Sequence, residues 1–572
     1  MKAIEDILKE TGGDGRFQVM LVTFLTLPRL PMLWSMMQMS FANYVPEWCC
    51  LPENQTDQSD EYCFIPNGNH SRFSKECVRN STSCNDKVFA SGIDTIVNKW
   101  NLVCERKWML PLTTSIQMAG VLVGAFVCGQ IIDLLGRRKT LYVSILLLGV
   151  FNIIAGFSSV WEMFAVMRFL IGFAIGLFLV VLQPYMMEFL SPSIRALPGL
   201  IPASQLGPAL MALTVWQLPD WRWSHWICAA LTLPNLIGYF FVPESLRWLT
   251  VQGRISEAEE VVKKIAGMNR KDVPIDCVEV LQASDMETKN KKKTSYTYFH
   301  IYKGWRLFKT SVILQILWCI FSLCAYGLSF SAASLGFNLY LNIFILNVVT
   351  IPFTSALTIL IGKIGRKKSA IIFLTCATAC GFGNLLVHLT VSDRGTRDLA
   401  VNVLSMMFRG TQTGAWAAVV IMTAEIYPTV IRGLGFGAAN VSARIGGILA
   451  PFALNLSDSP TLAFALMGGL TAASIVLILF LEETNGKAMR DTQADVDAKN
   501  PKNLELDGRD ADENTADAVP PGTGLEQGLG EKQLDELVSS DDQIRLESKQ
   551  DGVAVENGVV NEGFVNNASV RL

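Results

Sequence analysis

The chain has 572 residues, of which 50% are hydrophobic and 17% are charged, and its mean hydropathy is +0.33. Soluble globular proteins carry about 25% charged residues, so this composition excludes an ordinary soluble domain. The net charge of −3 is unevenly distributed. Nineteen acidic and nine basic residues follow position 484, a net charge of −10, which leaves the rest of the chain near +7.

Apolar runs of bilayer length recur along the chain, and each is predicted to be a transmembrane helix of about 20 residues. The first, 18–41, follows a polar stretch, 1–17, which is too acidic for the n-region of a signal peptide. Five more runs fall within 109–242 and six within 310–482. The runs are 18–41, 109–131, 140–158, 162–187, 196–216, 223–242, 311–330, 337–361, 369–390, 399–423, 433–455 and 461–481. The sequence therefore predicts an all-α membrane protein with twelve transmembrane helices.

Basic residues gather in the connections Arg137–Lys139, Lys363–Lys368 and Arg254–Lys309. With twelve spans, these three connections and both termini lie on the same side of the membrane. The positive-inside rule assigns the basic connections, and with them both termini, to the cytoplasm. We therefore expect cytoplasmic segments at 1–17, 243–309 and 483–572. The last of these is acidic, rich in Gly, Pro and Asn and without periodicity, which predicts disorder. Its final residues, Val570-Arg571-Leu572, are a candidate carboxylate ligand for a scaffold domain.

The loop 42–108 is predicted to be extracellular, and it holds six of the thirteen cysteines. An even number of cysteines in an oxidising compartment indicates disulfides, with fifteen possible pairings. The same loop carries three glycosylation sequons, at Asn54, Asn69 and Asn80. The six cysteines are Cys49, Cys50, Cys63, Cys77, Cys84 and Cys104.

The two halves of the chain repeat one another. A glycine followed by basic residues comes after span two and again after span eight, and an acidic and a basic residue seven positions apart close span four and span ten. Span four and span ten each also contain an arginine. The residues are Asp133, Arg137, Arg168, Glu188 and Arg195 in the first half, and Arg366, Arg409, Glu425 and Arg432 in the second. Two similar six-span bundles are typical of carriers whose site lies between them near the membrane midplane.

One full charge, Arg444, interrupts the apolar run of span eleven. At ~1.5 Å per residue it lies roughly 18 Å along the helix from Arg432, close to the bilayer centre. A cation at that depth costs at least ~2.5 kcal/mol, so it should face a polar path and not lipid. Asn440 lies one turn before Arg444 on the same face, which predicts a helix that lines a substrate path.

No metal-ligand spacing, nucleophile elbow or P-loop occurs in the sequence. This excludes an ATP-driven pump and indicates neither an enzyme nor a nucleic-acid-binding protein, and no cofactor is expected. The partners we expect are small organic ions and membrane lipid.

Several runs of residues resemble one family. They are Gly12–Gln18 (GGDGRFQ), Trp100–Glu105 (WNLVCE), Pro243–Trp248 (PESLRW), Glu425–Arg432 (EIYPTVIR) and the six-cysteine loop. Together they resemble the organic ion transporters of solute carrier family 22, in the major facilitator superfamily, over about residues 1–490. The resemblance implies two pseudo-symmetric six-helix bundles with a disulfide-rich extracellular loop, and a plasma-membrane carrier that works by alternating access.

Within that family, anion and carnitine-type carriers resemble this chain in placing an arginine where Arg444 lies. The resemblance also implies substrate-binding positions at Arg409, Tyr326, Trp216 and Trp416, beside Asn440. A guanidinium can bind a carboxylate through two parallel hydrogen bonds, and aromatic rings can bind flat or cationic groups. Internal pairing of Arg444 and plain helix packing of the aromatic residues are the alternatives. For Arg168 we expect a packing role.

The resemblance further implies that the inner charges form salt bridges that change as the carrier alternates. These gating residues are Asp133, Arg137, Glu188, Arg195, Glu425 and Arg432. The chain departs from the family at two points. Thr354 stands where kidney-type anion carriers often have a lysine, and the second inner motif, Gly362–Arg366, lacks its acidic residue.

The leading hypothesis is a carrier for small organic anions or zwitterions. The close rival is a carrier for organic cations or carnitine-like compounds, which aromatic walls would suit. A third hypothesis, from another class, is a receptor or scaffold that does not transport.

Overall fold

The computed structural model describes residues 4–51, 86–89, 92–190, 201–290, 298–332, 335, 338–427, 431–454 and 459–484. Some of the predictions fall outside these ranges, and so do the side chains of Cys49 and Cys50. The residues concerned are Cys63, Cys77, Cys84, Asn54, Asn69, Asn80, Arg195 and the C-terminal Val570-Arg571-Leu572.

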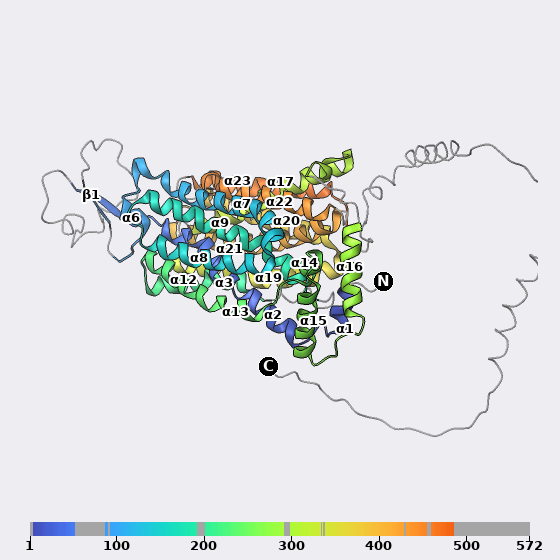
Figure 1. Ribbon diagram of the computed structural model, residues 1–572. Helices are drawn as coiled ribbons and strands as arrows, with labels where there is room; N and C mark the ends of the chain where they lie inside the picture. Colours follow the sequence, from blue (N-terminus) through green and yellow to red (C-terminus); the bar gives the residue numbers. More distant parts are fainter. Residues whose placement is uncertain are drawn as a thin grey trace, which may run out of the picture. The chain divides into compact units, whose positions relative to one another are not determined.

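Each of the twelve expected spans has a helical counterpart within the described ranges (Figure 1). Eight are long and apolar enough to cross a membrane. They are formed by α2 (Arg16–Thr26) with α3 (Arg29–Met37) and α4 (Met39–Ala42), α7 (Met109–Leu135), α8 (Arg137–Gly156), α9 (Trp161–Met187), α17 (Trp305–Phe330), α18 (Leu339–Val348) with α19 (Thr350–Ile364), α20 (Arg366–Thr390) and α23 (Pro460–Leu479).

The other four expected spans are shorter helices or carry more polar residues. They are α11 (Ala203–Gln217), α12 (Trp221–Leu236) with α13 (Gly238–Phe241), α21 (Arg394–Ile426) and α22 (Arg432–Ala453). Proline accounts for the break in the first span. Pro28 lacks an N–H and precedes α3, so the first span is broken there into consecutive helices.

Glycines allow close packing inside the first half. Gly120 and Gly124 of α7 lie against the backbone carbonyls of Phe169 and Phe173 on α9, where an added Cβ would clash. This small-xxx-small spacing lets two helix backbones approach closely, which is how spans associate without a hydrophobic driving force.

The helices outside the spans gather at two opposite ends (Figure 1). At one end, which we call the β1 end, β1 (Trp48–Leu51) pairs antiparallel with β2 (Asp86–Phe89) near α6 (Ile96–Trp100). Trp100 packs on Phe164 and Trp221, with ring centroids 5.3 and 5.4 Å away, and so fixes this loop to the spans.

The other end, which we call the α15 end, carries the helices of the N-terminus and of the long connection between the halves. They are α1 (Ile4–Glu10), α14 (Leu246–Val251), α15 (Ile255–Asn269), α16 (Cys277–Asn290) and the 3-10 helix η2 (Tyr298–Tyr302). Asn269 fixes the N-terminus to α15, because its Nδ2 donates to the carbonyl of Gly12 at 2.7 Å and its Oδ1 accepts from Phe17 N at 2.9 Å.

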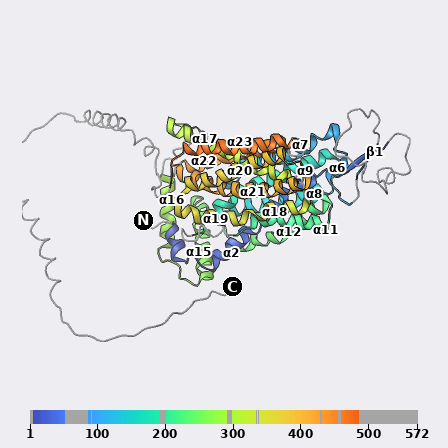
Figure 2. The same ribbon diagram turned by 180° about the vertical axis from the view of Figure 1, so that it is seen from behind.

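The two halves contact each other through α7 and α22, α11 and α18, and α4 and α17. Figure 2 shows α11 and α18 near the β1 end from behind. Ser115 Oγ donates to Ile448 O at 2.6 Å, and the rings of Phe41 and Tyr340 lie 6.2 Å apart. The interface between the bundles is therefore tied at the end that carries β1.

The structure describes one of the six loop cysteines in full and all of the cysteines elsewhere. Cys104, in the loop at the β1 end, is disulfide-bonded. Seven cysteines elsewhere are free: Cys128, Cys228, Cys277, Cys319, Cys324, Cys376 and Cys380.

Candidate functional site

Arg444 lies near the middle of α22 and is half-buried. Its Nη1 donates to the phenol oxygen of Tyr326 at 3.3 Å, and its Nη2 donates to Asn440 Oδ1 at 3.2 Å. Its Nε is buried and has no hydrogen-bond partner among the residues that the structure describes. Three of the predicted binding residues therefore lie together, and the spacing of Asn440 and Arg444 on one helix accounts for the contact between them.

Arg409 on α21 contacts the backbone of α17 next to the same tyrosine. Its Nη1 donates to the carbonyl of Ala325, the neighbour of Tyr326 in sequence, at 3.0 Å, and its Nε is buried without a partner. Within the part of the chain that the structure describes, neither Arg409 nor Arg444 forms an ion pair with a carboxylate. The hydrogen-bond partners of both arginines among the described residues are thus neutral.

Tyr326 brings this cluster to the boundary between the halves. Its hydroxyl lies 3.8 Å from Met36 Sδ on α3, in the first half. Gly447 of α22 packs near both Tyr326 and Met118 of α7. The Tyr326 ring is stacked on Phe330, with centroids 5.8 Å apart. The cluster of Arg444, Arg409, Tyr326 and Asn440, which we call the arginine cluster, therefore faces the first half across the interface.

Neither tryptophan has a hydrogen bond or ring contact, among the described residues, with a member of the arginine cluster. Trp416 packs on Trp318 and Phe321 of α17, at 4.8 and 5.7 Å between ring centroids, and is half-buried. Trp216 lies in the last turn of α11 and is 58% exposed. No hydrogen bond or ring contact among the described residues joins Trp216 to the other predicted binding residues.

Arg168, the counterpart of Arg409 in the first half, is fully buried. Its Nη1 donates to Gln38 Oε1 at 2.8 Å, and its Nη2 donates to Ser35 O at 3.2 Å and to Gln117 Oε1. These partners come from spans one and two, so Arg168 joins three spans. This geometry agrees with the packing role expected for Arg168, and it contrasts with the few protein partners of Arg409.

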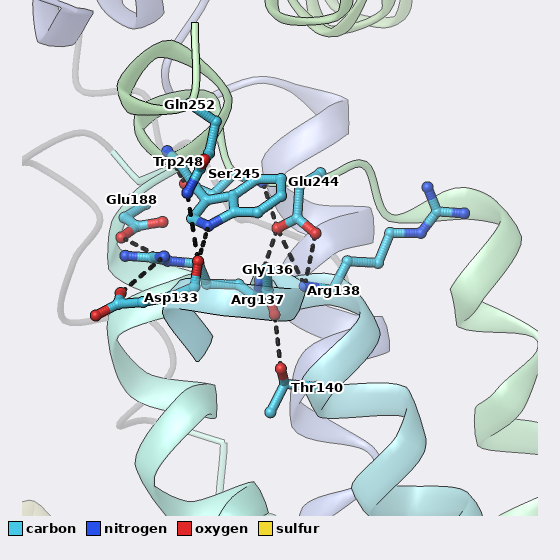
Figure 3. Close-up of polar contacts among 10 residues, drawn as sticks. All are labelled: Asp133, Gly136, Arg137, Arg138, Thr140, Glu188, Glu244, Ser245, Trp248 and Gln252. Atoms are coloured by element: carbon cyan, nitrogen blue, oxygen red, sulfur yellow. Dashed lines mark hydrogen bonds and ion pairs between the residues drawn. The ribbon is translucent and has the colours of Figure 1, made fainter. Parts of the chain in front are cut away.

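A second polar group, shown in Figure 3, lies at the α15 end of the first half. The Arg137 guanidinium lies 3.7 Å from Asp133 and 3.6 Å from Glu188. The Asp133 side chain is 80% exposed. Burial raises the pKa of the Glu188 carboxyl above its ordinary value, because desolvation outweighs the opposing effects of a Ser245 hydrogen bond and of Arg137.

Glu244, which the sequence analysis did not single out, holds this group together. Its carboxylate accepts hydrogen bonds from the backbone N–H groups of Arg137 at 2.8 Å and of Arg138 at 3.1 Å, and so caps the start of α8. Gly136 has φ of +88°, and an added Cβ there would clash with Glu244. A carboxylate at a helix N-terminus is favourable because it satisfies free N–H groups and the helix dipole.

The second half repeats this arrangement. Glu483 accepts from the backbone N–H groups of Arg366 and Lys367, both at 3.1 Å, at the start of α20. The Arg366 guanidinium binds Glu425 at 2.9 Å, and Thr484 Oγ1 donates to Glu425 at 2.5 Å. Glu425 thus pairs with Arg366, within its own half.

Among the described residues, Arg432 forms no ion pair with Glu425. Its Nε donates to the carbonyl of Tyr427 at 3.4 Å, and its Nη2 is buried without a partner. Among the described residues, no group of three His, Cys, Asp or Glu side chains could hold a metal ion.

The sequence of the chain is similar to those of known transporters. A family model described as "Sugar (and other) transporter" matches residues 70–495. The organic cation/carnitine transporter 2 of Homo sapiens is 32% identical over 407 residues, covering 70% of this chain and 71% of that protein. Solute carrier family 22 member 7 of Sus scrofa is 29% identical over 545 residues, covering 87% and 96%.

The fold is also similar to that of a solved structure. The xylose transporter XylE from E. coli, in an inward open conformation, has a TM-score of 0.60 and 16% sequence identity, covering 82% of this chain and 98% of that one. The chain is therefore a multi-pass secondary transporter and not an enzyme, and it belongs to the sugar-and-other-transporter family of the major facilitator superfamily, within solute carrier family 22.

Proposed function

We propose that this chain moves small organic anions or zwitterions of several kinds across the plasma membrane by alternating access. The observation that carries the proposal is the position of Arg444 at the boundary between the halves, with hydroxyl and amide oxygens as its partners. A buried cation without a counter-charge is unfavourable, and a substrate carboxylate offsets that cost when it binds.

Arg409 supports the same assignment. Its Nη1 donates to the carbonyl of Ala325, the residue before Tyr326. A carboxylate that enters between the two guanidinium groups gains attraction from both, and a guanidinium can bind it through two parallel hydrogen bonds. Trp416 and Trp318 then offer an aromatic wall for the organic part of the substrate.

The contacts between the halves support alternating access. The bundles are tied together at the β1 end, whereas Arg137–Glu188 and Arg366–Glu425 at the α15 end are pairs within a half. We assign the α15 end and both termini to the cytoplasm, because the basic connections lie there and the sequons lie in the loop of the β1 end. On this assignment the carrier faces the cytoplasm, and closing that face requires the inner charges to change partners.

Transport of organic cations or carnitine-like compounds is the second candidate. The human relative named above is called an organic cation/carnitine transporter. Carnitine carries both a carboxylate and a quaternary ammonium, so Arg444 and a ring such as Trp416 could bind its two ends. A simple cation would gain the aromatic contact but would be repelled by Arg444 and Arg409.

Uptake by intact cells tests the proposal. The substrate panel is urate, dicarboxylates, carnitine and tetraethylammonium, and the variants are Arg444→Ala and Arg444→Lys. We expect uptake of at least one anion or zwitterion, its loss by at least about tenfold in Arg444→Ala, and partial rescue in Arg444→Lys, which restores the charge without the planar fork. Arg394→Ala is the matched control, because Arg394 is exposed at the start of α21.

Three outcomes would contradict the proposal. Uptake of tetraethylammonium without any anion or zwitterion would reverse the order of the two candidates. Unchanged uptake in Arg444→Ala would remove Arg444 from the site. No uptake of any compound, with normal surface expression, would favour the receptor or scaffold hypothesis.

A further inference from the structure

Span one is interrupted between α3 and α4, and side chains from two other spans hold it there. The last carbonyls of a helix lack donors within that helix. Gln117 Nε2 on α7 donates to Ser35 O at 3.3 Å and to Met36 O at 3.5 Å. Arg168 Nη2 on α9 donates to Ser35 O at 3.2 Å. The end of α3 is therefore fixed by α7 and α9.

The two donors are joined to each other and fully enclosed. Gln117 Oε1 accepts from Arg168 Nη2, and Gln38 Oε1 accepts from Arg168 Nη1 at 2.8 Å. Arg168 and Gln117 are 0% exposed, and Gln38 is 2% exposed. Apolar side chains often fill a buried volume at less cost than a charged group, but a guanidinium donates stronger hydrogen bonds than a neutral amide. This arrangement indicates that the backbone of α3 has to be held in one position.

Met36, whose carbonyl is held by Gln117, contacts the other half of the molecule. Its side chain is 2% exposed, and its Sδ accepts a hydrogen bond from the Tyr326 hydroxyl at 3.8 Å. The same hydroxyl accepts from Arg444 Nη1 at 3.3 Å. Because a phenol has a single hydrogen, directing it to the sulfur leaves the lone pairs of the oxygen for the guanidinium. A continuous series of contacts therefore runs from Gln117 through α3 to Arg444.

We propose that Gln117 and Arg168 are positioning residues for the arginine cluster. They fix the α3 backbone so that Met36 orients the Tyr326 hydroxyl, and this hydroxyl in turn orients Arg444. Neither Gln117 nor Arg168 touches the substrate, and both act on affinity because they determine how Arg444 is presented. The role of Arg444 as the partner of the substrate rests on the proposed function, whereas the position of Met36 against Tyr326 does not.

Gln117→Glu separates positioning from packing. The new carboxylate keeps nearly the same volume and an acceptor for Arg168, but it has no N–H groups for the carbonyls of α3. We expect KM for the transported compound to rise about threefold, the scale of one lost hydrogen bond. The maximal rate and the Tm in detergent should stay near those of the natural chain. A lower Tm or maximal rate with an unchanged KM would show a structural role alone and overturn the proposal.

Met36→Leu tests the next contact in the series. It removes the sulfur and keeps an apolar side chain of similar size, so we expect a similar rise in KM. Met37→Leu is the matched control, because Met37 is the next residue of α3, is also buried and has no hydrogen bond to the arginine cluster among the described residues. Equal effects of the two substitutions would contradict a path through Met36.

The effect of Gln117 should depend on the Tyr326 hydroxyl. In a Tyr326→Phe background, we expect Gln117→Glu to change KM by less than about 1.5-fold, because the group that carries the effect to Arg444 is absent. Two residues that act independently would instead give effects that multiply, and that result would overturn the proposal.

A cross-link gives a readout that requires no transport. Met36→Cys and Tyr326→Cys together should be joined by a short bifunctional thiol reagent, and mass spectrometry measures the linked peptides. We expect the yield to fall about threefold when Gln117→Glu is added, and an unchanged yield would show that Gln117 does not position Met36. KM is measured with whichever compound of the uptake panel the natural chain carries. A wrong substrate class therefore leaves both readouts, and an absence of any uptake leaves the cross-link.

Discussion

The guanidinium of Arg444 is held in place by oxygens that carry no formal charge. The Tyr326 phenol and the Asn440 amide orient the group but leave its charge uncompensated, and the unpartnered Nε shows that the protein does not satisfy all of its donors. A site of this kind binds an anion with its cation already oriented, which reduces the ordering that the substrate must impose. The partners of Arg444 should therefore tune affinity without being essential for it.

Tyr326→Phe tests that expectation. The change removes one hydrogen bond to Arg444 and keeps the ring that stacks on Phe330. A hydrogen bond of this kind contributes about 0.5–1.5 kcal/mol, so we expect KM for an anionic substrate to rise about two- to tenfold while the maximal rate changes little. Tyr340→Phe, which alters a tyrosine at the β1 end, is the matched control. Equal effects of the two changes would argue against a positioning role for Tyr326.

Glu188 predicts a dependence on pH. Its pKa is raised in this conformation because it is buried. A proton binds more tightly to a conformation in which the pKa is raised, so acidification on the α15 side should favour this conformation over any in which Glu188 is hydrated. The window lies between the ordinary glutamate pKa of about 4.3 and the raised value.

The measurement is the pH profile of uptake, with the pH varied on the α15 side of vesicles, for the natural chain and for Glu188→Gln. The amide cannot titrate, so the part of the profile in that window should disappear. Asp133→Asn serves as a comparison, because the Asp133 side chain is largely exposed. A profile in Glu188→Gln that matches the natural chain would assign the titration to another group.

At the scale of elements, two helices begin in the same way. Both α8 and α20 start after a glycine with positive φ, at Gly136 and Gly365, and in both a glutamate from the end of another span caps the first N–H groups. The repeated sequence motif is thus a structural unit that joins the start of one span to the end of another. Its acidic partners, Glu244 and Glu483, therefore have a structural role at the starts of α8 and α20.

Removing either cap should destabilise the protein to a similar extent. We expect Glu244→Ala and Glu483→Ala each to lower the free energy of unfolding by about 1–2 kcal/mol, since each leaves helix N–H groups without acceptors. Thermal unfolding in detergent measures this as a lower Tm. Glu257→Ala on α15 removes a partly exposed carboxylate and is the control. A large loss from only one of the two caps would contradict their equivalence.

The helices were predictable from the sequence because hydropathy reports burial in lipid, and Asn440 could be placed next to Arg444 because both lie on one helix. The contact between Arg444 and Tyr326 could not be predicted, since it depends on how α17 packs against α22. For the same reason the sequence did not predict that Glu244 and Glu483 cap helices or that Glu425 pairs with Arg366, because these contacts join separate helices. Trp216 was placed in the site by resemblance alone, and its exposed position at the end of α11 separates it from the arginine cluster.

At the scale of the whole molecule, the asymmetry between the two ends is the main feature. Ties between the halves lie toward the β1 end, and the ion pairs at the α15 end remain within one half. The two bundles are also unequal at their centres, because Arg168 is enclosed by neutral side chains of its own half while Arg409 and Arg444 face the boundary. On the proposed function, the second half therefore carries most of the charge offered to a substrate.

A cross-link between the halves at the β1 end should stop transport. Phe41 and Tyr340 come from opposite halves and their rings are in contact, so cysteines at both positions, in a Cys376→Ser background, should react with a short reducible bifunctional reagent. The linked carrier cannot open at that end, and because alternating access requires both faces to open in turn, we expect uptake to be abolished and then restored by reduction. Each single cysteine variant treated in the same way is the control and should keep its uptake. Full uptake by the linked double variant would show that the β1 end need not open, and alternating access between these two bundles would then have to be abandoned.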